Sequence, residues 1–229
     1  MFRCILACDL KGGIVVRGVR GERDKYRPIQ EYSRLVTTSE PLAMIREMRP
    51  RETYIADLDR ITGAGDNLRA IAEISTLSRT MVDAGISREA DAALVSKAAG
   101  SIILGTETTP LPLIEALQGT SVLVSIDMRQ GRMLATDPTL ASSPLDSIRQ
   151  LNELELDWLI LLDVARVGSG EGIDLDLLRN SVAISKHPVI VGGGVRDVQD
   201  LEQIRQAGAA GAIIASAVHS LRIPLDLLR

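Results

Sequence analysis

The sequence is poor in cysteine, in aromatic residues and in long apolar stretches. Its 229 residues include two cysteines, and Phe, Trp and Tyr together make up 2% of the chain. With few rings for stacking and a formal net charge of −4, the chain lacks the basic, aromatic surface that binds nucleic acid. No apolar run reaches the roughly 18 residues that span a bilayer. We therefore expect no nucleic-acid partner and no membrane partner.

The scarcity of cysteine and histidine also limits the chemistry. Cys4 and Cys8 lie on one predicted strand, where four residues extend about 13 Å, too far for a disulfide. With His187 and His219 as the two histidines of the sequence, no usual zinc-ligand spacing and no Cys/His nucleophile pair is available. We expect neither a metal nor a cofactor, and we interpret both cysteines as small core residues.

The first residues, "MFRCILACDLKGG", do not have the features of a signal peptide. An acid follows the short apolar run directly, and no small-residue cleavage site is present. This start predicts a cytoplasmic location.

Eight short runs rich in Ile, Val and Leu alternate with segments of helical spacing. Strands are expected in "FRCILACD", "TYIADLD", "RTMVDAG", "GSIILGT", "SVLVSID", "DWLILLD", "HPVIVGGG" and "GAIIASA", and helices at 41–48, 67–77, 89–98, 112–117, 145–154, 175–184 and 198–206. Near-continuous apolar strands are typical of a parallel sheet covered by helices. Eight strand–helix units in 229 residues predict an α/β fold, a single-domain (β/α)₈ barrel with its site at the carboxyl ends of the strands.

The second half of the chain repeats the first. Asp9, Lys11 and Gly13 match Asp127, Arg129 and Gly131 in spacing. Further matches follow in the same order, between "DLDR" and "DVAR", and between "SIILGTET" and "AIIASAVH". A chance resemblance of strand ends explains one such match but not the series. We interpret the repeat as two half-barrels, at approximately 1–118 and 119–229.

The repeat places Asp9 and Asp127 at equivalent strand ends. Two carboxyl groups at one site can act as acid and base when their surroundings separate their pKa values. The alternative is that each Asp caps the turn after its strand. As a symmetric pair they are our candidate catalytic residues.

Glycines follow the seventh predicted strand and small residues follow the eighth. Gly192, Gly193 and Gly194 precede a helix that begins near Asp197, and Ala215 and Ser216 open the next one. In this barrel type the last two loops commonly bind phosphate through backbone N–H groups. A tight turn would also explain the glycines, but their position favours a phosphorylated small-molecule ligand.

The corresponding loops of the first half contain Gly85, Gly105 and Thr106, but also two acids. Asp83 stands where the other half has Gly192, and Glu107 follows Thr106. A carboxylate facing a phosphate would repel it. We expect this second phosphate site to be weakened, lost or converted to bind a hydroxyl or a cationic group.

Two further strand ends carry polar residues that either contact the substrate or form structural ion pairs. Asp57 follows the second strand, and Arg166 and Ser169 follow the sixth. The glycine-rich stretches "TGAGDN" and "GSGEG" beside them have the composition of mobile loops that could close over the mouth.

Together these motifs resemble the (β/α)₈ barrels of histidine biosynthesis, and specifically the phosphoribosylformimino-aminoimidazole carboxamide ribotide isomerase family. The resemblance covers nearly the whole chain and is carried by "ACDLKGGIVVRGVRG", "YIADLDRITGAGDNL", "SIILGTE", "VLVSIDMRQGRM", "LILLDVARVGSGEG", "PVIVGGGVRD" and "GAIIASAV". The piece "VVRGV" is also similar to the sister cyclase family. The resemblance implies an Amadori rearrangement of an aminoaldose to an aminoketose, with Asp9 as the base at C2 and Asp127 as the acid that helps to open the ribose ring.

The chain departs from the family at the substrate-recognition positions. The family's first two glycines after strand three are Asp83 and Ala84 here, and after strand six an Asp and a Thr are replaced by Val167 and Ser169. The tryptophan that the family often carries after strand five falls near Pro138. We therefore expect an isomerase on a different phosphorylated ribosylamine-type substrate. A noncatalytic phosphate-ligand-binding homologue, or a lyase or cyclase of cofactor biosynthesis, are the alternatives, and the oligomeric state stays open.

Overall fold

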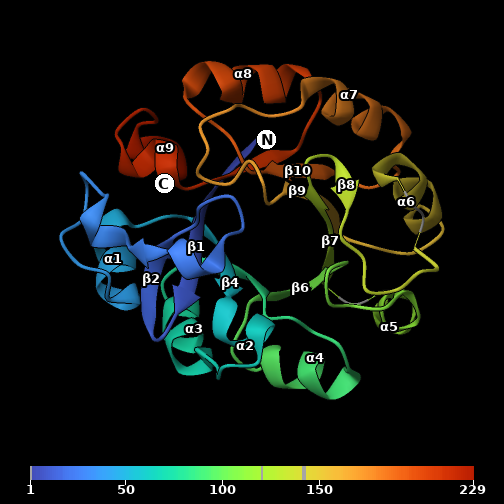
Figure 1. Cartoon of the computed structure of the whole chain (residues 1–229), viewed down its shortest axis with the longest axis horizontal. Helices are drawn as coiled ribbons and strands as arrows, with labels where there is room; N and C mark the ends of the chain where they lie inside the picture. Colours follow the sequence, from blue (N-terminus) through green and yellow to red (C-terminus); the bar gives the residue numbers. More distant parts are fainter. Residues whose placement is uncertain (1, 120, 141–142) are drawn as a thin grey trace.

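The computed structural model describes residues 2–119, 121–140 and 143–229, and these form a closed barrel of parallel strands surrounded by helices (Figure 1). The barrel strands run in the order of the chain, and the last of them pairs with the first, Leu6 opposite Ile214. They are β1 (Arg3–Lys11), β4 (Glu52–Asp57), β5 (Arg79–Asp83), β6 (Ser101–Gly105), β7 (Val122–Arg129), β9 (Trp158–Asp163), β10 (Val189–Gly192) and β11 (Gly211–Ile214). The predicted (β/α)₈ barrel is confirmed.

Helices lie on the outer face of the barrel. They are α1 (Pro41–Met48), α3 (Leu68–Ser75), α4 (Glu89–Val95), α5 (Leu111–Leu117), α6 (Pro144–Leu151), α7 (Leu175–Ile184), α8 (Val198–Gln206) and the short α9 (Ser216–His219). Several begin at a residue whose side chain accepts a hydrogen bond from a first-turn N–H, as at Ser143, Asp174 and Asp197. Such caps stabilise a helix by about 1 kcal/mol each.

Alternation along the strands separates two buried layers and determines which residues reach the site. In β1, Leu6, Cys8 and Leu10 pack outward against the helices, while Ile5 belongs to the apolar cluster inside the barrel. Because side chains alternate between faces with period 2, Asp9 lies on the inner face. The same alternation in β7, with Leu123 inside and Val124 and Ile126 outside, turns Asp127 inward.

Each proposed half-barrel carries a small hairpin after its first strand. β2 (Ile14–Arg17) runs antiparallel to β1, and β8 (Arg132–Met133) runs antiparallel to β7. A carboxylate supports each turn: Asp59 accepts the Gly12 N–H at 2.6 Å, and Asp163 accepts the N–H groups of Gln130 and Gly131 at 3.1 and 3.2 Å. These hairpins support the interpretation as two half-barrels, which stays a prediction.

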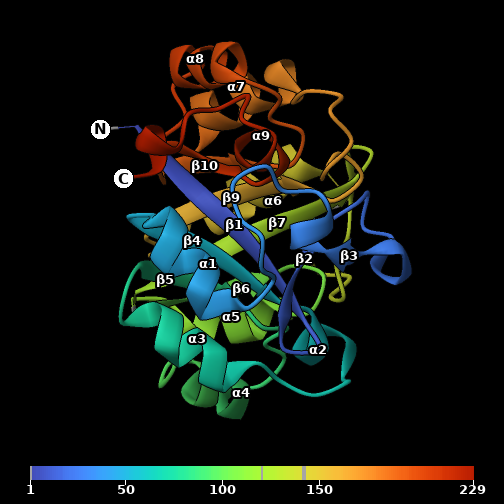
Figure 2. The same cartoon turned by 90° about the vertical axis from the view of Figure 1, so that its left-hand side faces the viewer.

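Short elements missing from the sequence analysis cover one end of the barrel. β2 continues to β3 (Arg27–Pro28), flanked by the 3₁₀ turns η1 (Arg23–Lys25) and η2 (Ile29–Glu31), and this segment projects where β1 ends (Figure 2). α2 (Leu58–Thr62) begins inside the predicted strand "TYIADLD" and reaches only the first residue of "TGAGDN", which we expected to be a mobile loop. The 3₁₀ turn η3 (Leu225–Leu228) lies near the C-terminus. In the described part of the chain, no helix is long and apolar enough to cross a lipid bilayer.

Candidate functional site

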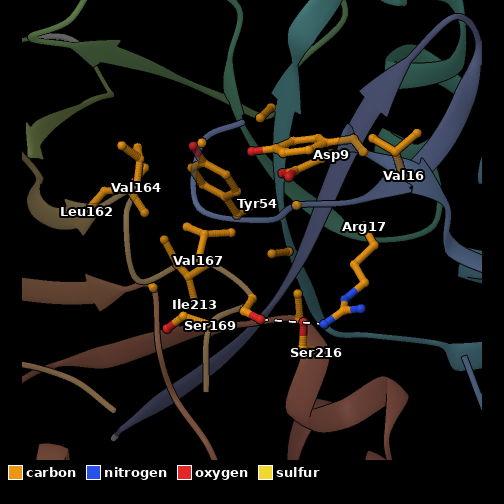
Figure 3. A pocket seen from close by; sticks show the side chains of 18 of the residues that line it. Asp9, Val16, Arg17, Tyr54, Leu162, Val164, Val167, Ser169, Ile213 and Ser216 are labelled. Carbon is orange, nitrogen blue, oxygen red and sulfur yellow. Dashed lines mark hydrogen bonds between the residues drawn. The ribbon is translucent and has the colours of Figure 1, made fainter. Parts of the chain in front are cut away.

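A cavity of about 430 Å³ opens at the carboxyl ends of the strands, a volume in the range of small-molecule sites. It collects residues from both halves of the chain: carboxylates from β1, β5 and β7, and glycines and Ser216 from the loops after β10 and β11. Figure 3 shows Asp9 and Tyr54 at its upper end and Ser169 and Ser216 at its lower end. The cavity therefore has an acidic end and an end rich in backbone and hydroxyl groups.

Asp127 is 3% exposed and is held at both oxygens. Ser125 donates its hydroxyl to Oδ1 at 2.6 Å, and the backbone N–H of Glu107 donates to Oδ2 at 3.1 Å. Burial raises the pKa of Asp127, and the nearby carboxylate of Asp83 raises it further, against the hydrogen bond from Ser125. The surroundings thus favour a protonated Asp127 that is fixed in orientation.

Asp9 lies in a different environment at the end of β1. Burial raises its pKa to about 7; Arg23 lowers it and Asp83 raises it. A carboxyl group with this pKa is ionised in a large fraction of molecules near neutral pH. Asp83 raises the pKa of both carboxyl groups, and their other neighbours differ: Arg23 acts on Asp9, whereas Ser125 and the Glu107 N–H donate to Asp127.

Two glycines make room for the paired carboxylates. A Cβ atom on Gly18 would lie 2.6 Å from Asp9 Oδ2, and one on Gly105 would lie 2.7 Å from Asp127 Oδ2. Both distances are shorter than van der Waals contact, so any larger residue at either position would displace the carboxylate. Gly105 is thus a packing partner of Asp127 rather than part of the cavity lining.

The lower end of the cavity contains a stacked arginine. The Arg17 guanidinium lies 3.8 Å from the centre of the Tyr32 ring, and Tyr32 donates its hydroxyl to the Ser216 carbonyl at 3.4 Å. Arg17 also donates to the Gly168 carbonyl at 3.5 Å (Figure 3), and its buried Nε has no hydrogen-bond partner among the described residues. This arginine is placed to meet an anion beside Gly193, Gly194 and Ser216.

His219 lines the same end of the cavity and stays neutral. Burial lowers its pKa to about 4. The Ser33 hydroxyl oxygen accepts the N–H groups of Leu35 and Val36 and lies 2.9 Å from His219 Nδ1. Because Ser33 already accepts two hydrogen bonds, we infer that its hydroxyl donates to His219 Nδ1, which leaves the imidazole proton on Nε2.

The structure brings together many of the candidate residues from the sequence analysis. The cavity is lined by Asp9, Asp127, Gly193, Gly194, Ala215, Ser216 and Ser169. Gly192 lies outside it, at the end of β10 against Leu162 and Ile213. Gly85 packs on Ile61 with φ +62°, and the buried Thr106 hydroxyl accepts the Asp127 N–H at 2.9 Å and donates to the Leu134 carbonyl at 2.8 Å.

Asp57 and Arg166 also lie outside the main cavity. Asp57 is fully buried and accepts hydrogen bonds from the Asn67 backbone and side chain at 2.9 and 2.7 Å. Arg166 donates to the Gly172 carbonyl at 2.9 Å and lies 3.6 Å from Asp163. Arg166 and Asp163 thus form a structural ion pair, the alternative expected from the sequence, whereas Asp57 is held by the amide groups of Asn67. A substrate role for either Asp57 or Arg166 stays a prediction.

Sequence reasoning missed Tyr54, Arg17, Tyr32 and His219. Tyr54 stood in an apolar run, and only its place on the inner face of β4 turns it into the cavity. Arg17 lies in "VVRGV", but the sequence does not indicate its role, because Gly168 is distant in the sequence and Tyr32 lies outside the strand pattern. Among the described residues, no group of three or more His, Cys, Asp or Glu could hold a metal ion.

The barrel and its cavity define a class: (β/α)₈ proteins with inward carboxyl groups at the ends of the first and fifth barrel strands and a glycine-rich site at the last two. A family model described as "Histidine biosynthesis protein" matches residues 3–224. The chain belongs to this family, as its resemblance indicated.

Relatives of similar length carry two kinds of description. An uncharacterized protein of Methanocaldococcus jannaschii is 32% identical, covering 98% of this chain and 96% of its own. The 1-(5-phosphoribosyl)-5-((5-phosphoribosylamino)methylideneamino) imidazole-4-carboxamide isomerase of Deinococcus radiodurans is 30% identical, covering 96% and 95%. An isomerase of the same name from Thermus thermophilus is 28% identical, covering 97% of each chain.

Proposed function

We propose that this protein is an aldose–ketose isomerase that carries out an Amadori rearrangement on a phosphorylated ribosylamine-type substrate. The observation that carries the proposal is the pair of inward carboxyl groups, Asp9 and Asp127, which share one cavity but have different neighbours. The isomerase names of the relatives in Deinococcus and Thermus support the reaction type.

Asp127 is the general acid in this proposal. Burial and Asp83 raise its pKa, so it holds a proton at neutral pH. It donates that proton to the ribose ring oxygen as the C1–O bond breaks and the nitrogen lone pair forms a C1=N bond. Ser125 and the Glu107 N–H fix the carboxyl group, which limits the motion needed before proton transfer.

Asp9 is the base. Its carboxylate removes the proton from C2, the C2–H electron pair forms a C1=C2 bond, and the electrons of C1=N return to nitrogen. The resulting enaminol loses its hydroxyl proton and gains a proton at C1, which gives the aminoketose. A pKa of about 7 suits a base that must both accept and release a proton near neutral pH.

The lower end of the cavity would hold the substrate's phosphate. Gly193 and Gly194 have φ values of +90° and +95°, and a Cβ on Gly194 would overlap the Gly172 carbonyl. Side chains are thus excluded from this part of the loop, and the backbone can approach an anion closely. Arg17 supplies a guanidinium, and Ser216 supplies a hydroxyl.

The proposal includes a substrate specificity that has diverged from histidine biosynthesis. Asp83 and Glu107 line the cavity at the end where the family's second phosphate would be bound by glycines. Ile61 and Val167 border the same cavity and add apolar surface to it.

The test is turnover of two aminoaldose phosphates: the bisphosphorylated ribotide of histidine biosynthesis, and the N-phenyl ribosylamine 5-phosphate that forms from ribose 5-phosphate and aniline. We expect conversion of at least one to an aminoketose, and a loss of about 100-fold or more in Asp9→Asn and Asp127→Asn. Asp176→Asn, a surface change outside the cavity, is the matched control. Equal turnover in parent and cavity variants would contradict the proposal.

A further inference from the structure

The acidic end of the cavity has more carboxyl groups than guanidinium groups. Asp83, Glu107 and Asp127 line it together with Asp9. A Cβ on Gly105 would lie 2.7 Å from Asp127 Oδ2 and 3.4 Å from Asp83 Oδ2, so the two buried carboxyl groups face the same glycine. The cations of this end are Arg23, which pairs with Glu107 at 2.9 Å, and Arg129, which donates to the Arg20 carbonyl at 3.2 Å.

Tyr54 provides a second, independent observation. Its side chain projects from β4 into the cavity, and the residue is 4% exposed. Within the described part of the chain, its hydroxyl has no hydrogen-bond partner. Burial raises the pKa of Tyr54, and the nearby carboxylates of Asp83 and Asp127 raise it further. The hydroxyl oxygen is not among the buried atoms that lack a partner, so it opens onto the cavity, where it is placed to bind a ligand.

We infer that the acidic end binds a protonated amine, and that the substrate is a singly phosphorylated amino compound. The inference rests on the proposed function for the phosphate at the opposite end of the cavity. Of the two ligand groups that the sequence left open for the acidic end, a hydroxyl and a cationic group, it selects the cationic group. An ammonium group has three N–H donors; the carboxylates of Asp83 and Glu107 and the Tyr54 hydroxyl oxygen supply three acceptors.

A second phosphate at this end is excluded by the same side chains. Asp83 takes the place of a glycine, and the space above Gly105 is occupied by Asp127 Oδ2. Phosphate oxygens would therefore meet carboxylates where the family's substrate needs N–H donors, and their charges would repel. An ammonium instead donates charge-assisted hydrogen bonds to the carboxylates of Asp83 and Glu107.

Matched pairs of monophosphates test the inference by calorimetry. One pair is 2-aminoethyl phosphate and glycol phosphate; the other is glucosamine 6-phosphate and glucose 6-phosphate. We expect the amine of each pair to bind about tenfold or more tightly, and the advantage to be lost in Asp83→Asn and Glu107→Gln. Tyr54→Phe should reduce it without changing the binding of the hydroxyl compounds. Arg17→Met should weaken all four ligands alike.

The outcomes separate this inference from the proposed function. Equal affinities within both pairs, or no binding of either amine at millimolar concentration, would overturn the inference even if the ribosylamines are isomerised. A preference for fructose 1,6-bisphosphate over the amines would also overturn it. A clear preference for the amines, with no isomerase turnover in the parent protein, would support the amine site while removing the proposed reaction.

Discussion

At the scale of single residues, the role of Asp127 as the acid depends on the groups that set its pKa. Ser125 is fully buried and donates to Oδ1 at 2.6 Å. This hydrogen bond favours the ionised carboxylate and lowers its pKa against the effect of burial. Ser125 therefore tunes the acid without touching the substrate.

Ser125→Ala should raise the pKa of Asp127 further. Because Asp127 acts in its protonated form, the alkaline limb of the profile of kcat against pH should move to higher pH. Loss of the buried hydrogen bond should cost about 1 kcal/mol of stability. The measurement is the pH profile of turnover together with urea unfolding, and an unmoved alkaline limb would remove Asp127 from the role of acid.

Ser181→Ala is the matched control. Ser181 is also fully buried, but its Oγ has no hydrogen-bond partner among the described residues. Removing an unsatisfied hydroxyl should leave stability unchanged or raise it by up to about 1 kcal/mol. The pH profile of this variant should match that of the parent.

The residues that could be predicted were those that end an apolar run with a charge. Asp9 and Asp127 stand out in this way, and so do Asp83 and Glu107. Tyr54 could not be found, because a tyrosine inside "TYIAD" is equally typical of either face of a strand. The Arg17 stacking on Tyr32 could not be found either, since it depends on the loop between β2 and α1.

At the scale of elements, the ends of the strands hold the carboxylates through close packing with glycine. Gly105 ends β6 and packs against the Asp127 carboxylate, and Gly18 follows β2 and packs against the Asp9 carboxylate. In both cases the glycine and the carboxylate lie on, or directly after, neighbouring strands, so the positions of the carboxylates depend on the register between those strands.

Gly105→Ala and Gly18→Ala should reduce turnover by about 100-fold or more, because each new methyl group would overlap a reacting carboxylate. Gly63→Ala is the control: it has φ +72° but no atom within 4 Å of its Cβ, so it should cost about 1 kcal/mol of stability with unchanged kcat. Steady-state kinetics and thermal unfolding of the three variants make the comparison. Full activity in Gly105→Ala would show that Asp127 need not occupy its present position.

The sequence predicted the regular elements well and the short ones poorly. All eight barrel strands coincide with predicted apolar runs, although β1, β4 and β7 extend one or two residues beyond them, and helices such as α7 and α8 have the predicted bounds. β3 and β8 have two residues each and α2 has five, too few for a periodic pattern. α2 follows β4 because Asp57 caps it and the left-handed Gly63 ends it, whereas the sequence pattern predicted a strand as far as Asp59 and a loop from Thr62.

At the scale of the whole molecule, the buried carboxyl groups link stability to pH. The folded-state pKa of Asp9 is about 7 against an ordinary 3.8, and burial also raises those of Asp83 and Asp127. Between pH 3.8 and about pH 7, the carboxyl group of Asp9 is more often protonated in the folded protein than in the unfolded chain. The folded protein therefore binds more protons over this range, and its stability falls as pH rises. Asp91 and Asp200 have lowered pKa values, and their contribution is lost instead as pH falls below about 4.

We therefore expect the free energy of unfolding to be highest in mildly acidic solution and to decrease from about pH 4.5 to pH 7. Asp83→Asn should flatten this decrease by up to about 1.4 kcal/mol per pH unit, because it removes one proton-binding group. Urea unfolding at half-unit pH steps measures both slopes. A stability that increases across this range in the parent protein would contradict the assigned protonation.

In the proposed reaction, Asp9 removes the proton at C2 of a phosphorylated ribosylamine. Proton NMR of the ribotide and of N-phenyl ribosylamine 5-phosphate in D₂O, with the parent protein and with Asp9→Asn, follows this proton directly. We expect the parent to remove the C2 proton signal of at least one substrate as the aminoketose forms, and Asp9→Asn to leave it in place. Loss of the signal at the same rate in both proteins, or in neither, would rule out Asp9 as the base.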